Sequence, residues 1–164
     1  MRIGIYWKKI AVSERPLGLQ QDHMIPETDT HHYFEFHVSS EPLPRHVKFE
    51  NPRGNLAGHI IEEISVPQRF EKEIRGFLKL AGGKPLTFFG HIAYNLQGST
   101  AISHDYWPKP VGAYRGVPYL LEQACTRHLK GEGLTHVMTS ETPSRGRRKQ
   151  VERVGLEAGR ETEI

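Results

Sequence analysis

His104 and Asp105 are the side chains of this chain best suited to act as a catalytic base. A base that takes a proton from a nucleophile works best when its pKa lies near the working pH, and proteins commonly tune imidazole and carboxylate groups to that range. Both residues fall in an alternating segment that predicts a strand, so they occupy opposite faces and only one can serve a given cleft. Tyr114 carries a phenol that could act as an acid. For each residue the alternative is a structural or surface role.

A short turn opens directly into a helix after these residues. It carries Arg115 and Gly116, and Pro118 suits the first helical position. A helix N-terminus presents unpaired backbone N–H groups and a partial positive charge, which together can hold a phosphate. Gly116, Val117 and Tyr119 would supply N–H groups beside the Arg115 side chain, because proline has none to give. The turn therefore predicts phosphate binding, with an ordinary helix start as the alternative.

The periodicity of apolar residues indicates the elements that must position these groups. Alternation predicts strands, and a period of 3.6 predicts helices. The predicted strands span 2–12, 31–38, 47–49, 56–64, 86–96, 100–107, 134–140 and the tail to 164; the predicted helices span 67–81, 118–130 and 142–154. The segment 100–140 should form a right-handed, parallel strand–helix–strand crossover. Together these elements predict an α+β fold with a mixed, largely antiparallel sheet and flanking helices.

The order of elements in residues 85–164 resembles a known family. A hairpin (GHIAYNLQGSTAISHDYW) is followed by the turn, an apolar helix, a Gly-Leu-Thr strand, a Pro/Ser loop and a basic helix that ends in Val-Gly-Leu. This succession resembles the acetyl-CoA-binding core of the GNAT N-acetyltransferases, with a weaker similarity in the 46–64 hairpin. The resemblance implies one GNAT-like acyltransferase domain over residues 1–164, in which 1–84 form the acceptor-side half and 85–164 the CoA-binding core.

The resemblance also implies roles for individual residues. In the family, the pantetheine arm of CoA enters where two central strands separate, which here are 100–107 and 134–140. Backbone amides near Tyr106 and Trp107 would then pair with the cofactor like an added strand. Ser144 stands where the family often has an asparagine. Val151 stands where the family has a tyrosine that protonates the leaving thiolate, so another group would have to act as the acid.

Five cations lie within nine residues of the last predicted helix: Arg145, Arg147, Arg148, Lys149 and Arg153. Such a cluster can contact the phosphates of CoA or of a nucleic-acid backbone. In the GNAT interpretation we assign Arg148 to the cofactor site. The alternative is a solvated helix face whose cations stand favourably near the C-terminal end of the helix.

The resemblance favours an acyl-CoA-dependent N-acyltransferase. Its cofactor would be acetyl-CoA or another acyl-CoA, its acceptor an unknown amine, and its mechanism direct attack on the thioester with His104 or Asp105 as base. The alternative is a catalytically inactive GNAT-like fold that acts as a basic nucleic-acid- or protein-binding module. Val151 and the altered glycine turn favour this alternative, whereas Arg115-Gly116 and the ordered core favour the enzyme.

Three polar residues share one face of the predicted strand 31–38: His31, Glu35 and His37, with His46 nearby in the sequence. Imidazole and carboxylate suit zinc, iron or manganese. The helical second half of the chain argues against the all-β folds that build metal sites on such a strand. We therefore interpret these residues as the polar face of a half-buried strand and expect no metal.

Composition sets the remaining expectations. A chain of 164 residues with a net charge of +3 predicts one globular domain and a weak preference for anionic partners. No apolar run approaches the roughly 20 residues of a membrane span, and the first residues lack the pattern of a signal peptide. The single cysteine, Cys125, cannot form an internal disulfide, which suits a reducing cytoplasm. Exposed edge strands could also pair two copies into a homodimer.

Overall fold

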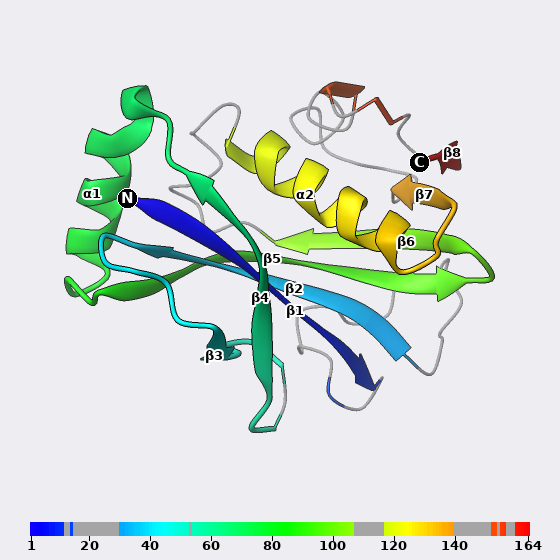
Figure 1. Ribbon diagram of the computed structural model, residues 1–164, viewed down its shortest axis with the longest axis horizontal. Coiled ribbons are helices and arrows are strands. Elements are labelled where there is room, and N and C mark those ends of the chain that lie inside the picture. Colours follow the sequence, from blue (N-terminus) through cyan, green and yellow to red (C-terminus); the bar gives the residue numbers. More distant parts are fainter. Residues whose placement is uncertain are drawn as a thin grey trace.

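The computed structural model describes residues 1–11, 14, 30–52, 54–106, 117–139, 152–153, 155–156 and 160–164, and for 104–106 it describes the backbone. Its strands are β1 (Arg2–Ala11), β2 (Thr30–Ser39), β3 (His46–Lys48), β4 (Ala57–Ser65), β5 (Leu86–Gln97), β6 (Thr100–Tyr106), β7 (His136–Thr139) and β8 (Thr162–Glu163). Its helices are α1 (Glu71–Leu80), which follows a 3₁₀ turn at Gln68–Phe70, and α2 (Val117–Gly131). The α+β class that the sequence predicts is confirmed (Figure 1).

All eight strands belong to one sheet with the order β3-β4-β1-β2-β5-β6-β7-β8. Each neighbouring pair is antiparallel except β6 and β7, which run parallel. Helix α2 connects these two strands, so the parallel crossover that the sequence predicts is confirmed. The parallel pairing joins Thr100–Ser103 to His136–Thr139, while β6 itself continues to Tyr106.

The two helices cover one face of the sheet. Ile3 and Ile5 of β1 and Phe34 and Phe36 of β2 form a single buried cluster with apolar residues of both helices. The residues that the helices contribute are Ile74 and Leu78 of α1 and Leu121, Ala124, Cys125 and Leu129 of α2. Their spacing places them on one side of each helix, which is why these amphipathic segments fold onto the sheet.

The opposite face of β2 is buried as well, which corrects the prediction of a half-buried strand. Residues 31–39 are all buried, including the positions that we interpreted as a polar, solvent-facing row. β2 lies in the interior of the sheet between β1 and β5, and β3 and its flanking residues cover its second face. Val47 and Phe49 pack there against Tyr6, Tyr33 and the neighbouring apolar residues.

The predicted helix 67–81 differs in its first turn. Pro67 precedes the 3₁₀ turn, and the α-helix begins at Glu71. Its predicted stop is confirmed, because Gly82 and Gly83 have φ angles of 94° and 67°, and the Gly83 N–H donates to the Leu78 carbonyl oxygen at 2.9 Å. None of the described helices is long and apolar enough to cross a membrane.

Candidate functional site

The carboxyl end of β6 and the beginning of α2 lie at the same end of the sheet (Figure 1). This is the end at which β1 begins and the parallel pairing of β6 with β7 stops. In a strand–helix–strand unit, ligands bind beyond the carboxyl ends of the parallel strands, where the helix N-terminus also points. Ser103 and Thr139, the last residues of the parallel pairing, are both buried. This edge is therefore the first candidate site.

Of the predicted phosphate donors, Val117 and Tyr119 lie in the first turn of α2. The Val117 side chain is buried in the helix-side core, so its backbone rather than its side chain could face a ligand. The Tyr119 hydroxyl accepts a hydrogen bond from Gln123 Nε2 at 2.8 Å. The first-turn amides of α2 therefore remain candidates for phosphate binding.

The register places His104, Asp105 and Tyr106 opposite Ala93, Ile92 and His91 of β5. The His104 and Tyr106 positions consequently belong to one face of the sheet and the Asp105 position to the other, as the alternation predicts. The other predicted site residues lie outside the described residues: Trp107, Tyr114, Arg115, Gly116, Ser144 and Arg148. Of the five predicted cations, Arg153 is described, and it is exposed.

A buried carboxylate lies on β2, two strands from β6. The sequence pattern did not assign it to a site. Glu35 is fully buried on β2. It accepts hydrogen bonds from the Tyr33 hydroxyl at 2.5 Å and from the backbone N–H groups of Glu50 and Asn51 at 3.0 and 3.2 Å. His37 Nε2 lies 2.9 Å from Glu35 Oε1, whereas Tyr33 and Asn51 donate to Oε2. Glu35 thus fastens the chain that leaves β3 to the centre of the sheet.

The network continues toward β6. The Asn51 side-chain nitrogen lies 2.8 Å from Nδ1 of His91, which is buried on β5. Because an amide nitrogen can only donate, His91 Nδ1 is the acceptor and the proton of a neutral His91 ring is on Nε2. The register then aligns Glu35, His91 and Tyr106 in one row across three strands. This row of positions therefore reaches β6, the strand that carries the predicted base.

Burial and the Glu35 carboxylate raise the pKa of Tyr33 well above its usual range, so its hydroxyl stays protonated and acts as a donor.

Glu35 and His37, two of the residues that the sequence offered as metal ligands, lie together in this network. His46 instead lies exposed on β3, opposite His59. Among the described residues, no three His, Cys, Asp or Glu side chains are arranged to hold a metal ion.

A second aromatic cluster lies on the helix side of the sheet around Trp7. Its indole N–H donates to Nδ1 of His32 at 3.1 Å, and the two rings stack with centroids 5.7 Å apart. The rings of His59 on β4 and His128 on α2 meet Trp7 edge-on. Burial lowers the pKa of His32 to about 4, and nearby Lys9 adds to the effect. His32 is therefore neutral in the folded protein at neutral pH.

The lowered pKa of His32 predicts a loss of stability in mild acid. The unfolded chain binds a proton near the ordinary pKa of 6.5, whereas the folded protein resists protonation until about pH 4. The free energy of unfolding should therefore fall as the pH decreases through this window, by on the order of 1–2 kcal/mol from this residue. Urea unfolding at pH 7.5, 5.5 and 4.5 measures the slope.

His32→Asn tests the assignment, because an asparagine oxygen can still accept the Trp7 N–H but does not titrate in this range. The variant should show a shallower decline of stability between pH 6.5 and 4. His46→Asn, a change at an exposed histidine, should leave the decline unchanged. Equal slopes for the wild-type protein and His32→Asn would contradict the role of His32.

Comparison of the chain with protein-family models, with curated proteins and with solved structures finds no match. The class of protein is therefore defined by the fold: an α+β protein with one mostly antiparallel eight-stranded sheet, two described helices on one face and one parallel crossover. The function has to be argued from the geometry at the carboxyl end of β6.

Proposed function

We propose that this protein is an acyl-CoA-dependent N-acyltransferase of the GNAT type, which transfers an acetyl group from acetyl-CoA to an amine. The observation that supports the proposal is the parallel β6–α2–β7 unit, whose strand pairing ends at Ser103 and Thr139 although β6 runs on to Tyr106. The β6 backbone beyond Ser103 is paired with β5 on one side. Its other side could pair with the amides of a pantetheine arm, in the manner of an added strand.

The residues at this edge suit the remaining parts of CoA. The first-turn amides of α2, at Val117 and Tyr119, would meet the pyrophosphate together with Arg115 and Gly116. The family resemblance also assigns Ser144 and Arg148 to cofactor contacts. Bound acetyl-CoA would supply an activated thioester. The chain's part is to align the amine with that carbonyl and to polarise the carbonyl with backbone N–H groups.

The polar face of the sheet that carries Glu35 and His91 favours His104 over Asp105 as the base. The His104 position shares its face with Glu35 and His91, whereas the Asp105 position is opposite Ile92, a residue of the helix-side core. A base on the polar face could take the proton that the amine loses as the new carbon–nitrogen bond forms and the carbon–sulfur bond breaks. Valine occupies position 151, where the family has the tyrosine that protonates the departing thiolate. Tyr114 would take over that role.

Thermal unfolding with acetyl-CoA, CoA, ATP or buffer alone tests the cofactor site. A ligand at about 100 times its dissociation constant should stabilise the folded state by roughly 2.7 kcal/mol, which is several degrees for a domain of this size. We expect shifts with acetyl-CoA and CoA and none with ATP. No shift at millimolar acetyl-CoA would contradict the proposal. Salt-sensitive binding of nucleic acid in its place would favour the inactive, basic binding module.

A matched pair of variants tests where the cofactor binds. Arg115→Ala should weaken acetyl-CoA binding by about tenfold, the effect of losing one hydrogen bond to a charged group. Arg127→Ala removes an exposed arginine from a later turn of α2, where it pairs with Glu62, and should leave the affinity unchanged. Isothermal titration calorimetry measures both. Equal losses for the two variants would indicate only a general effect of positive charge.

A further inference from the structure

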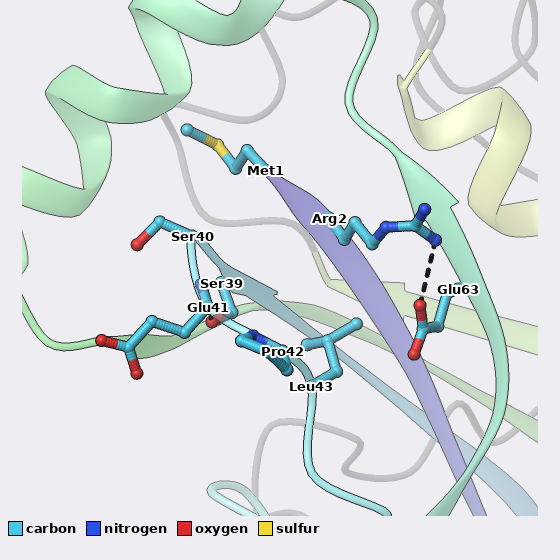
Figure 2. Close-up of a pocket in the computed structure, with 8 residues that line it drawn as sticks. All are labelled: Met1, Arg2, Ser39, Ser40, Glu41, Pro42, Leu43 and Glu63. Carbon is cyan, nitrogen blue, oxygen red and sulfur yellow. Dashed lines mark hydrogen bonds and ion pairs between the residues drawn. The ribbon is translucent and has the colours of Figure 1, made fainter.

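A cleft of about 370 Å³ opens where β1 begins and β2 and β4 end (Figure 2). Its volume is within the range of small-molecule sites. The cleft is lined by Met1, Arg2, Ser39, Ser40, Glu41, Pro42, Leu43 and Glu63. These residues come from β1, from β4 and from the end of β2 with the turn that follows it. β5 lies between β2, the nearest strand that lines the cleft, and β6, so the cleft is distinct from the proposed cofactor site.

The wall formed by residues 39–44 is held in place by contacts to β1 and within the turn. The Tyr6 hydroxyl donates to the Pro44 carbonyl oxygen at 2.7 Å, and the Glu41 N–H donates to Ser39 Oγ at 3.0 Å. Leu43 packs directly over Gly4, where an added Cβ would lie 3.2 Å from Leu43 Cδ1. A wall fixed in this way loses little conformational entropy when a ligand binds.

The charged groups stand on two sides of the cleft. Figure 2 shows the Arg2–Glu63 pair on one side and Ser40 and Glu41 on the other. Arg2 Nη1 donates to Glu63 Oε2 at 3.1 Å, and the two side chains are 56% and 41% exposed. An ion pair this exposed contributes little to stability, so a ligand can insert between its partners at small cost. The side-chain charges of Arg2, Glu41 and Glu63 sum to −1, and the α-ammonium of Met1, which also lines the cleft, adds +1.

We propose that this cleft binds a free basic α-amino acid of the lysine type. Its α-carboxylate would pair with Arg2 and its α-ammonium with Glu63, each taking over the partner's role in the existing ion pair. Its side-chain cation would meet Glu41, and its methylene groups would lie against Pro42 and Leu43. A simple cation would be repelled by Arg2, and a simple anion by Glu63.

Amide chemical-shift mapping of the whole chain with added lysine tests the proposal, and it requires no CoA. Lysine should move the amide signals of residues 2, 39–41, 43 and 63 and should bind about threefold more tightly than leucine, the effect of one exposed ion pair. Spermidine and acetate should bind more weakly than lysine. Shifts scattered over the surface, or equal responses to lysine, spermidine and acetate, would overturn the proposal.

Two substitutions separate the contacts. Glu41→Gln should abolish the preference for lysine over leucine, whereas Glu63→Gln should weaken both ligands about threefold or more. Glu62→Gln is the matched control, because it breaks another exposed Arg–Glu pair, Arg127–Glu62, which lies outside the cleft. Unchanged affinities in Glu41→Gln and Glu63→Gln, with folding confirmed by the amide spectrum, would also overturn the proposal. None of these results depends on the acyltransferase assignment.

Discussion

Replacing Glu35 with alanine is expected to lower the free energy of unfolding by about 3–5 kcal/mol, a loss typical of removing one partner from a buried charged network. The carboxylate is fully buried and accepts hydrogen bonds from the Tyr33 hydroxyl and from two backbone N–H groups, at Glu50 and Asn51. Without it, the buried Tyr33 hydroxyl and the two partly buried N–H groups lose their acceptor. His37, whose Nε2 lies 2.9 Å from the carboxylate, would lose its partner as well.

Urea unfolding followed by far-ultraviolet circular dichroism measures the loss. Glu41→Ala, at an exposed glutamate on the turn after β2, is the control and should change the stability by less than about 0.5 kcal/mol. A loss under about 1 kcal/mol for Glu35→Ala would mean that water can take the place of the carboxylate as acceptor. The carboxylate would then not be what holds residues 50 and 51 to the sheet.

The same network predicts non-additive effects. Tyr33→Phe removes the hydroxyl that donates to Glu35 and should cost about 1–3 kcal/mol. In the Glu35→Ala background that hydroxyl has already lost its acceptor, so the second substitution should cost much less. A double-mutant cycle isolates this coupling, which for residues in one hydrogen-bond network is usually about 0.5–3 kcal/mol.

Local periodicity in the sequence was sufficient to predict most of the individual elements. The alternation of Ile3, Ile5 and Trp7 placed a strand at 2–12, and β1 spans Arg2–Ala11. Glycines at 82–83 marked the end of α1 because only a left-handed backbone closes the helix there. The parallel direction of β6 and β7 followed from the helix between them.

The order of the strands was not available from periodicity. β4 pairs with β1, and β2 pairs with β5, although each pair is separated by more than 40 residues along the chain. Alternation records only whether each face of a strand is apolar or polar. Tyr33, Glu35 and His37 read as a polar row, and the sequence alone does not specify that β3 and the residues after it cover them.

One signal could have identified the Glu35 network. Residues 31–38 place aromatic side chains on both faces of a strand, at Tyr33 on one and Phe34 and Phe36 on the other. A strand that is apolar or aromatic on both faces belongs in the interior of a sheet, where a carboxylate requires hydrogen-bond donors. The candidate cofactor site was predicted differently, from a family resemblance. Of its residues, the structure describes Val117, Tyr119 and the backbone of 104–106.

Replacing Gly58 with alanine is expected to cost about 2–3 kcal/mol through overpacking. Gly58 lies on β4, and a Cβ there would be 2.1 Å from Cζ and 2.3 Å from Cε1 of Phe49. The Phe49 ring has little room to yield, since it is 3% exposed and meets the Tyr33 ring edge-on with centroids 5.0 Å apart. The absence of a side chain at position 58 therefore allows Phe49 to cover the sheet directly above the Glu35 network.

A rescue experiment and a control distinguish this clash from a general preference for glycine. In a Phe49→Ala background the clash is gone, so Gly58→Ala should cost less than about 0.5 kcal/mol there. Gly76→Ala, inside α1, places its Cβ within 4 Å of nothing beyond its chain neighbours and its own helix backbone. It should stabilise the protein by about 0.5–1 kcal/mol, because alanine favours a helix interior over glycine. Chemical denaturation of the four variants measures these differences. If Gly58→Ala is equally costly with and without the Phe49 ring, the cause lies in the β4 backbone and not in the contact with Phe49.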